Sequence, residues 1–200
     1  MTQIKNDWIG NNKSTFSTLG ASSHSNTERE SNDYYATDPR AVEKLLERET
    51  FNKYIWEPAC GEKHISNVLT SRGHNVRNSD ITSRNQSDVE EIDFMTATKD
   101  IMSRDIITNP PYKIATEFIQ HALDISMDST KIAAFLKIQF LESKKRYELF
   151  KENPPVRIYV FVNRINCGKN GVFSKEASAV CYAWFIWEKG NKKEPIIRWI

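Results

Sequence analysis

The chain has 200 residues, of which 39% are apolar and 11% aromatic, so it is long enough for one domain with a packed core. No stretch approaches the roughly 20 apolar residues of a membrane span, and the N-terminus lacks the apolar region of a secretory signal. The three cysteines are scattered and form no CxxC pair, which argues against a disulfide framework and a zinc site. We therefore expect a cytoplasmic protein with free thiols that binds no metal and no membrane.

The formal net charge of +2 conceals an asymmetry. From Lys137 to the end, 13 Lys and Arg stand against 6 Asp and Glu, a net of +7, so the rest of the chain carries −5. A basic C-terminal part suits a polyanionic partner, although lysines and arginines also serve simply to solvate a surface.

Residues 1–33 are rich in Ser, Thr and Asn, which predicts a flexible polar tail before a single domain over residues 34–200. In that domain, Asp38 and Pro39 suit a helix N-cap and first helical position, and Gly73 suits a helix end. The helical spacing of apolar residues predicts helices over residues 39–51, 65–73, 116–126 and 142–153.

Runs of apolar, β-branched and aromatic residues predict seven strands, over residues 54–58, 74–81, 88–95, 104–109, 131–138, 156–165 and 179–189. Strands that alternate with helices indicate an α/β fold, here a Rossmann-like, doubly wound and mostly parallel sheet. The segment between the last two strands is too polar and glycine-rich for a long helix. These two strands are therefore expected to pair as an antiparallel C-terminal hairpin.

Acidic residues stand where two of these strands end. Glu57 closes the first strand before the turn Pro58–Gly61, and Asp80 closes the second strand 19 residues after Gly61. In open α/β sheets, ligands bind at the carboxyl ends of the strands, near the switch in strand order. Glycine lets backbone approach a ligand, and a carboxylate about 20 residues further on is typical of a group that binds ribose hydroxyls. A GxGxxG motif is absent, so a dinucleotide pyrophosphate is not favoured.

A third strand end carries the sequence TNPPY at residues 108–112. Asn109 offers a side-chain carbonyl, and the carbonyl of Pro110 stays available because Pro111 has no N–H. Together they could accept both hydrogens of an exocyclic amine, while Tyr112 stacks on the heterocycle. Alone, such a segment is more often a structural turn. The two acidic strand ends upstream favour a binding site instead.

EPACG at 57–61, Asp80 and TNPPY at 108–112, in this order on an α/β pattern, resemble the class I S-adenosylmethionine-dependent methyltransferases. In particular, they resemble the phage- and prophage-type N6-adenine DNA methyltransferases with an NPPY motif. The similarity extends from about Tyr34 to the C-terminus. It includes DYYATDPRAVEKLL at 33–46, IDF at 92–94 and FLK at 135–137.

The resemblance implies methyl transfer from S-adenosylmethionine to the N6 amine of adenine in DNA, on a flipped-out base and without metal. A phage-encoded enzyme of this kind would act in the bacterial host cytoplasm. The implied catalytic residues are Asn109, Pro110, Pro111 and Tyr112. The implied cofactor-binding residues are Tyr35, Thr37, Glu57, Pro58, Ala59, Cys60, Gly61, Asp80, Asp93, Phe94 and Asn109. Among these, Glu57 and its turn would hold the methionine part, Asp80 the ribose, and Asp93 with Phe94 the adenine.

The sequence departs from the family pattern at Lys63, where many relatives have a second glycine, so a differently shaped loop is expected. It also lacks the large separate target-recognition domain of many restriction-linked relatives. Contacts to DNA are therefore expected from the N-terminal tail and from the segments 138–150 and 163–178. The candidate phosphate contacts are Arg146, Arg164, Lys169 and Lys175, each equally compatible with a solvated surface charge.

Three alternatives remain open from the sequence. The same NPPY chemistry serves methylation of a glutamine side-chain amide in a protein, or of adenine in RNA. The third is a protein of another class, a catalytically decayed relative that still binds cofactor or DNA. The intact motif at 109–112 argues against decay, whereas Lys63 argues mildly for it.

Overall fold

The computed structural model describes residues 35–84, 86–98, 104–169 and 180–200, so the expected tail over residues 1–33 and the candidate Lys175 lie outside it. The helices are α2 (Pro39–Leu46), α3 (His64–Ser71), α4 (Ala115–Ile125) and α5 (Tyr147–Glu152). The strands are β1 (Tyr35–Thr37), β2 (Tyr54–Glu57), β3 (Asn75–Asp80), β4 (Glu90–Glu91), β5 (Asp105–Thr108), β6 (Lys131–Lys137), β7 (Arg157–Val160), β8 (Cys167–Lys169), β9 (Tyr182–Glu188) and β10 (Ile196–Trp199). Within these residues, no helix has the length and apolar character needed to cross a membrane.

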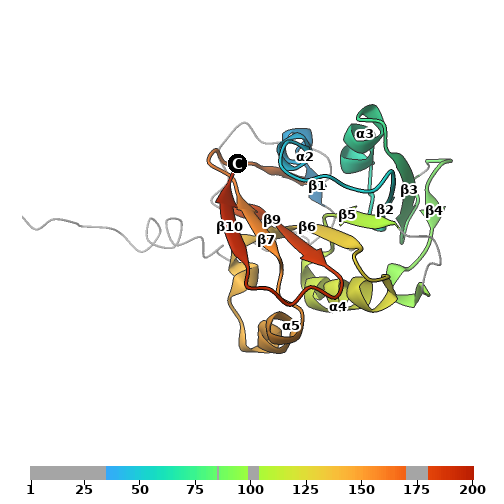
Figure 1. Ribbon diagram of the computed structural model, residues 1–200. Coiled ribbons are helices and arrows are strands. Elements are labelled where there is room, and N and C mark those ends of the chain that lie inside the picture. Colours follow the sequence, from blue (N-terminus) through green and yellow to red (C-terminus); the bar gives the residue numbers. More distant parts are fainter. Residues whose placement is uncertain (1–34, 85, 99–103, 170–179) are drawn as a thin grey trace, which may run out of the picture.

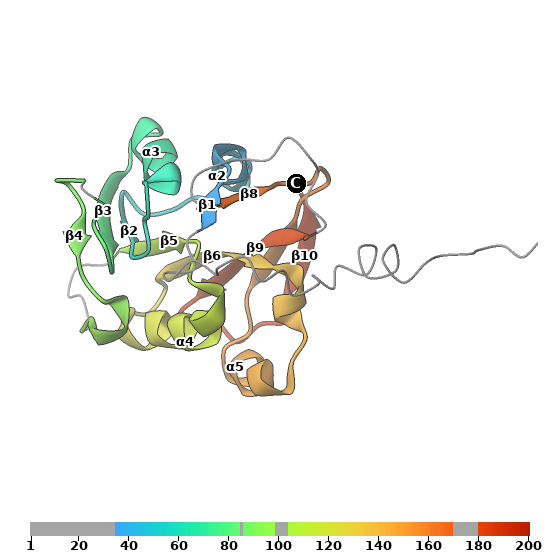
Figure 2. The same ribbon diagram turned by 180° about the vertical axis from the view of Figure 1, so that it is seen from behind.

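Eight of the strands form one mixed sheet in the order β10-β7-β9-β6-β5-β2-β3-β4. Neighbours pair in parallel except at β9, which runs antiparallel to both β6 and β7. Helices α2 and α3 cover one face of the sheet, and α4 and α5 cover the other (Figures 1 and 2). The doubly wound, mostly parallel sheet expected from the sequence is thus confirmed.

Each face of the sheet has its own apolar core, and β6 contributes to both. Ala133 and Phe135 of this strand lie in the core under α2 and α3, whereas Ile132 and Ala134 lie in the core under α4 and α5. Side chains that alternate between two buried faces explain why this strand is a continuous apolar run.

Helix α2 begins as its sequence predicts. The Asp38 side chain accepts a hydrogen bond from the Arg40 backbone N–H at 2.9 Å, and Pro39 is the first helical residue. The buried indole N–H of Trp184 in β9 donates to the carbonyl of Ala41 at 2.8 Å and ties the helix to the sheet. After α3, Gly73 has φ of +88°, which confirms the expected glycine at the helix end.

The sheet has eight strands rather than the seven expected. The additional strand is β10, which pairs in parallel with β7 and has four exposed residues. Its sequence, Ile-Ile-Arg-Trp, does not alternate between apolar and polar residues, and neither face of the strand is buried. The pattern that indicates a half-buried strand is therefore absent. The last two expected strands do pair antiparallel as β7 and β9, but β8 interrupts their connection and pairs with β1, so they do not form a plain hairpin.

Several other expected elements are shorter than predicted. The helix expected over residues 39–51 ends at Leu46, and the strand expected over residues 156–165 covers only Arg157–Val160. The helix expected over residues 142–153 is α-helical only in α5, because the Ser143 hydroxyl accepts from the Lys145 N–H and starts a 3₁₀ turn instead. The strand expected over residues 88–95 shrinks to Glu90–Glu91. Here the Asp93 side chain accepts from the Met95 N–H and starts a second 3₁₀ turn.

Candidate active site

Four neighbouring parallel strands, β3, β2, β5 and β6, end at the same edge of the sheet. At or just after their last residues they carry Asp80, Glu57, Asn109 and Lys137. From β2 the chain continues to one side through β3 and β4, and from β5 it continues to the other side through β6. The switch in strand order therefore lies between β2 and β5, where a ligand site is expected.

A pocket opens at this switch point. All four residues of the NPPY motif line it, as does every predicted cofactor residue except Gly61. The sequence did not indicate the other lining residues, which are Ala36, His64, Ile65, Ile81, Arg84, Ile92, Met95, Ile114 and Phe118. Apolar spacing marks the buried face of a helix such as α4, but it does not mark which side chain of that face borders a pocket.

A two-stranded sheet brings the segment 35–37 to the pocket. Strand β1 pairs antiparallel with β8, with Tyr35 opposite Lys169 and Thr37 opposite Cys167. The Thr37 side chain lines the pocket and is 2% exposed. Its hydroxyl oxygen is buried and has no hydrogen-bond partner in the described part of the chain. A buried polar atom of this kind is uncommon and favours a ligand that supplies the partner.

Asn109 is oriented by the same segment. Its amide nitrogen donates to the backbone carbonyl of Tyr35 at 2.8 Å, so its carbonyl oxygen Oδ1 points the other way. This oxygen is buried without a hydrogen-bond partner among the described residues. The structure therefore holds an acceptor at the pocket in one orientation, with its hydrogen-bonding capacity unused.

Glu57 is almost fully buried, at 1% exposure. Its Oε2 accepts from the Ser66 backbone N–H at 2.8 Å and from the Ser66 hydroxyl, which ties β2 to helix α3. Burial raises the pKa of Glu57 to about 8, the Ser66 hydrogen bonds oppose this, and the nearby Asp80 charge adds to it. At neutral pH the carboxyl group is thus protonated, and a cation in the pocket would favour its ionised form.

Asp80 is held by the glycine turn. The Gly61 N–H donates to Asp80 Oδ2 at 2.8 Å, and the Thr82 N–H donates to Oδ1 at 3.2 Å. Gly61 has φ of +52° and Lys63, the departure from the family pattern, has φ of +63°. The Lys63 ammonium reaches across to the Asp88 carboxylate at 2.7 Å, so a lysine fits this loop by joining it to the loop after β3.

The turn that follows β2 also carries a cysteine, Cys60. Burial, followed by the charges of Glu57 and Asp80, raises the pKa of Cys60 to about 12, so its thiol stays protonated. Within residues 35–84, 86–98, 104–169 and 180–200, no three His, Cys, Asp or Glu side chains are grouped to hold a metal ion.

The Tyr112 ring belongs to an aromatic group beside the pocket. Its centroid lies 5.6 Å from that of Tyr35 and 6.1 Å from that of Tyr182, both tilted. The Lys137 ammonium lies 4.8 Å from the Tyr112 centroid, and the Tyr112 hydroxyl contacts the Cys167 sulfur at 3.4 Å. Burial raises the pKa of Tyr112 well above its usual value, so the phenol is neutral.

Asp93 and Phe94 lie together at another wall of the pocket. The Asp93 side chain is used in part to cap the 3₁₀ turn that follows. Phe94 is 3% exposed, and its ring stacks on Phe118 with centroids 4.2 Å apart. Most of Phe94 is thus part of the core under α4, and only a portion of the ring borders the pocket.

The candidate phosphate contacts lie in different surroundings. The Arg146 guanidinium donates to the carbonyl of Phe140 at 2.7 Å and to two other carbonyls of the same turn, which holds the segment after β6. These bonds leave Arg146 less available to a phosphate than the sequence indicates. Arg164 is exposed on the turn before β8, and Lys169 is the last residue of β8.

Solved methyltransferase structures share this fold. A putative class I S-adenosylmethionine-dependent methyltransferase from Listeria monocytogenes matches with a TM-score of 0.54 and 14% identity, over 81% of this chain and 64% of that one. The 23S rRNA methyltransferase ErmE matches with a TM-score of 0.56 and 15% identity, over 78% and 70%. The type IIG restriction endonuclease BpuSI matches with a TM-score of 0.53 and 16% identity, over 78% and 25%.

The chain therefore has the fold of class I S-adenosylmethionine-dependent methyltransferases. It spans 64% of the length of the Listeria protein and a quarter of the restriction endonuclease. No protein-family model matches the sequence, and a search of curated proteins also finds no match. At these identities the likeness shows the fold alone.

Proposed function

We propose that this protein transfers a methyl group from S-adenosylmethionine to the N6 amine of adenine in DNA. The proposal depends most on Asn109, whose amide nitrogen is bonded to Tyr35 and whose Oδ1 is buried without a partner in the described part of the chain. A buried acceptor without a partner favours binding of a ligand that donates a hydrogen bond to it. The Pro110 carbonyl, one residue on, accepts no hydrogen bond from the described residues. These two acceptors suit the two hydrogens of one exocyclic amine.

The proposed chemistry is direct transfer. When bound, the cofactor supplies an electrophilic methyl group on sulfur. Asn109 and Pro110 accept the N6 hydrogens, which raises the electron density on nitrogen and aims its lone pair at the methyl group. The N–C bond forms as the C–S bond breaks, and the surplus proton on nitrogen leaves to water. Tyr112, a neutral ring beside these acceptors, is assigned to stack on the base.

The residues present fit this cofactor. Both Asp80 oxygens are already fixed by backbone N–H groups and keep lone pairs for ribose hydroxyls. Glu57 lies where the ammonium of the methionine part would favour its ionised form, and the unpaired Thr37 hydroxyl offers a further contact. Asp93 and Phe94 are assigned to the adenine of the cofactor.

The fold alone does not distinguish among possible methyl acceptors, because it is shared with an rRNA methyltransferase and with a restriction endonuclease. A glutamine amide and an adenine in RNA carry the same NH₂ group. The net charge of +7 from Lys137 onward supports a polyanionic substrate over a protein. The orientation of Asn109 supports an active enzyme over a decayed one.

The substitution Asn109→Ala tests the proposal. It removes one of the two acceptors without touching Glu57 or Asp80. We expect kcat on adenine-containing DNA to fall by about 100- to 1,000-fold, as on loss of one oriented hydrogen-bonding group at a reacting centre. The affinity for S-adenosylhomocysteine, measured by calorimetry, is expected to stay within about twofold.

Asn109→Asp provides the matched comparison, because it keeps an acceptor but loses the donor to Tyr35. We expect its activity to lie between those of the wild type and Asn109→Ala. Loss of cofactor binding in both variants, rather than loss of transfer, would show that the clamp role of Asn109 is wrong.

A further inference from the structure

Lys137 ends the FLK segment and lies beside the pocket without lining it, and the resemblance gives it no role. It is the last residue of β6, next to β5, which leads into the NPPY motif. Its side chain is partly buried, and its ammonium lies 4.8 Å from the centroid of the Tyr112 ring. The lysine therefore contacts the ring that is assigned to stack on the target base.

The Lys137 charge has no anion to neutralise it in the described part of the chain. Other cations near the site are used within the protein, since Lys63 pairs with Asp88 and Arg146 donates to backbone carbonyls. Among the described residues, the Lys137 ammonium has neither a hydrogen bond nor an ion pair, and its contact is with the ring face. An ammonium has three donors, so the ring contact leaves them available.

The neighbouring polar groups do not supply a negative charge. Burial raises the pKa of Tyr112, of Tyr182 and of the Cys167 thiol, so all three are neutral at pH 7. The Lys137 charge is thus left available to an anionic ligand. Its position at the carboxyl edge of the sheet, beside a stacking ring, indicates what that ligand would be.

We propose that Lys137 binds the backbone phosphate of the nucleotide whose base stacks on Tyr112. A nucleotide carries its phosphate one sugar away from its base, whereas a glutamine side chain carries no anion at all. The inference rests on the proposed function and narrows it, because it makes Lys137 a residue that selects nucleic acid over a protein amide.

The test uses Lys137→Met, which keeps the aliphatic stem on the Tyr112 ring but removes the charge. Binding of a fluorescent duplex containing adenine is measured between 50 and 200 mM salt. We expect affinity to fall about fivefold at low salt and the slope of log K against log[salt] to decrease by about 0.9, the value for one phosphate contact. The affinity for S-adenosylhomocysteine is expected to stay near that of the wild type.

Two further variants make the test specific. Lys137→Arg keeps a cation and should keep the wild-type slope. Lys193→Met removes an equal charge from the exposed connection between β9 and β10, which lies at the opposite edge of the sheet, and should change neither affinity nor slope. Thermal melting of each variant checks that it is folded.

The outcomes separate the inference from the proposed function. If the wild type methylates DNA but Lys137→Met keeps the full salt slope, the inference is overturned, whatever happens to kcat, because the lysine then only positions Tyr112. If the wild type binds S-adenosylhomocysteine and labels a glutamine peptide but no nucleic acid, the proposed function itself fails.

Discussion

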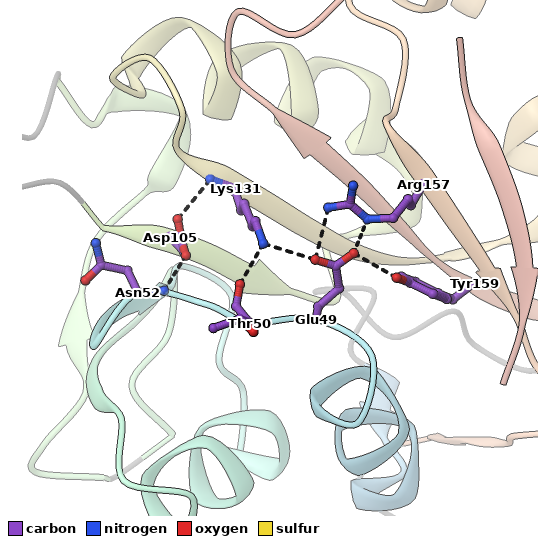
Figure 3. Close-up of polar contacts among 7 residues, drawn as sticks. All are labelled: Glu49, Thr50, Asn52, Asp105, Lys131, Arg157 and Tyr159. Atoms are coloured by element: carbon purple, nitrogen blue, oxygen red, sulfur yellow. Dashed lines mark hydrogen bonds and ion pairs between the residues drawn. The ribbon is translucent and has the colours of Figure 1, made fainter. Parts of the chain in front are cut away.

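The two edges of the central sheet differ in whether their buried polar groups have hydrogen-bond partners within the protein. At the amino edge, where β5, β6 and β7 begin, carboxylates are satisfied by neighbouring cations and N–H groups (Figure 3). At the carboxyl edge, Asn109 Oδ1 and Thr37 Oγ1 are buried with no partner among the described residues. The carboxylates of the amino edge are thus paired within the protein, whereas these two oxygens remain available to a ligand.

Glu49 is the centre of the amino edge. Its side chain is 4% exposed and accepts from the Arg157 guanidinium, from the Tyr159 hydroxyl at 2.8 Å and from the Lys131 ammonium at 3.1 Å. Beside it, Asp105 accepts from the Lys131 backbone N–H at 2.9 Å and from one further backbone N–H. These bonds join the loop after α2 to three strands of the sheet (Figure 3).

Glu49 at the amino edge and Glu57 at the carboxyl edge respond to pH in opposite directions. Burial acts to raise the pKa of Glu49, but the bonds from Arg157, Tyr159 and Lys131 outweigh it and lower the pKa. Its contribution to stability is present at neutral pH and is lost as the pH falls into the acid range. The raised pKa of Glu57 has the reverse effect, because stability is then lost as the pH rises.

Removing the Glu49 carboxylate from the amino edge should have the largest effect on stability. Glu49→Ala leaves Arg157 and Lys131 without their carboxylate, and we expect the free energy of unfolding in urea to fall by about 3–5 kcal/mol. Glu148→Ala is the control, since that carboxylate is 67% exposed and pairs with the exposed Lys151. A loss at Glu49 no larger than that at Glu148 would mean that the amino edge is not what fixes the sheet.

A smaller effect is expected at the carboxyl edge, where Glu57 makes the free energy of unfolding depend on pH. Native Glu57 holds a proton up to about pH 8, whereas the unfolded side chain loses it near pH 4.5, so wild-type stability falls as pH rises through this window. Glu57→Gln removes this titration. Between pH 6 and pH 8, its free energy of unfolding should gain about 1–3 kcal/mol relative to the wild type. Parallel pH curves for the two proteins would contradict an unfavourably buried carboxyl group at Glu57.

The smallest effect is expected at the loop that carries Lys63. Lys63→Gly suits the positive φ of this position but removes the contact to Asp88. Because the pair is partly exposed, we expect affinity for S-adenosylhomocysteine in calorimetry to weaken by about two- to threefold. Asp88→Asn should weaken this affinity equally. The double variant with Lys63→Gly and Asp88→Asn should bind no more weakly than either single variant. Tighter binding by Lys63→Gly would show that the lysine impairs the pocket instead of supporting it.

Features set by local chemistry could be predicted from the sequence. Asp38 and Pro39 start a helix, Gly73 follows one, and TNPPY ends a strand, because each depends on the backbone needs of a few neighbouring residues. Alternating strands and helices then bring Glu57, Asp80 and Asn109 to one edge, since parallel strands share their carboxyl ends.

Features that depend on contacts between distant segments could not be predicted. Strand β10 has no buried face to mark it, and β8 is a strand only because it pairs with β1. A lysine at a strand end looks like any solvated charge until its ring neighbour is known, which is why the sequence indicated no role for Lys137 although FLK is part of the resemblance. For the same reason, Arg146 appeared available for phosphate although it is bonded to carbonyls of its own turn.

In the proposed function, Asn109 Oδ1 and the Pro110 carbonyl hold the N6 amine of an adenine in DNA. The direct measurement is transfer of a tritiated methyl group from S-adenosylmethionine to DNA, RNA and protein substrates in parallel, with Asn109→Ala as the blank. We predict label in DNA that is recovered as N6-methyladenine after digestion. Label in protein or RNA, with none in DNA, would contradict the claim.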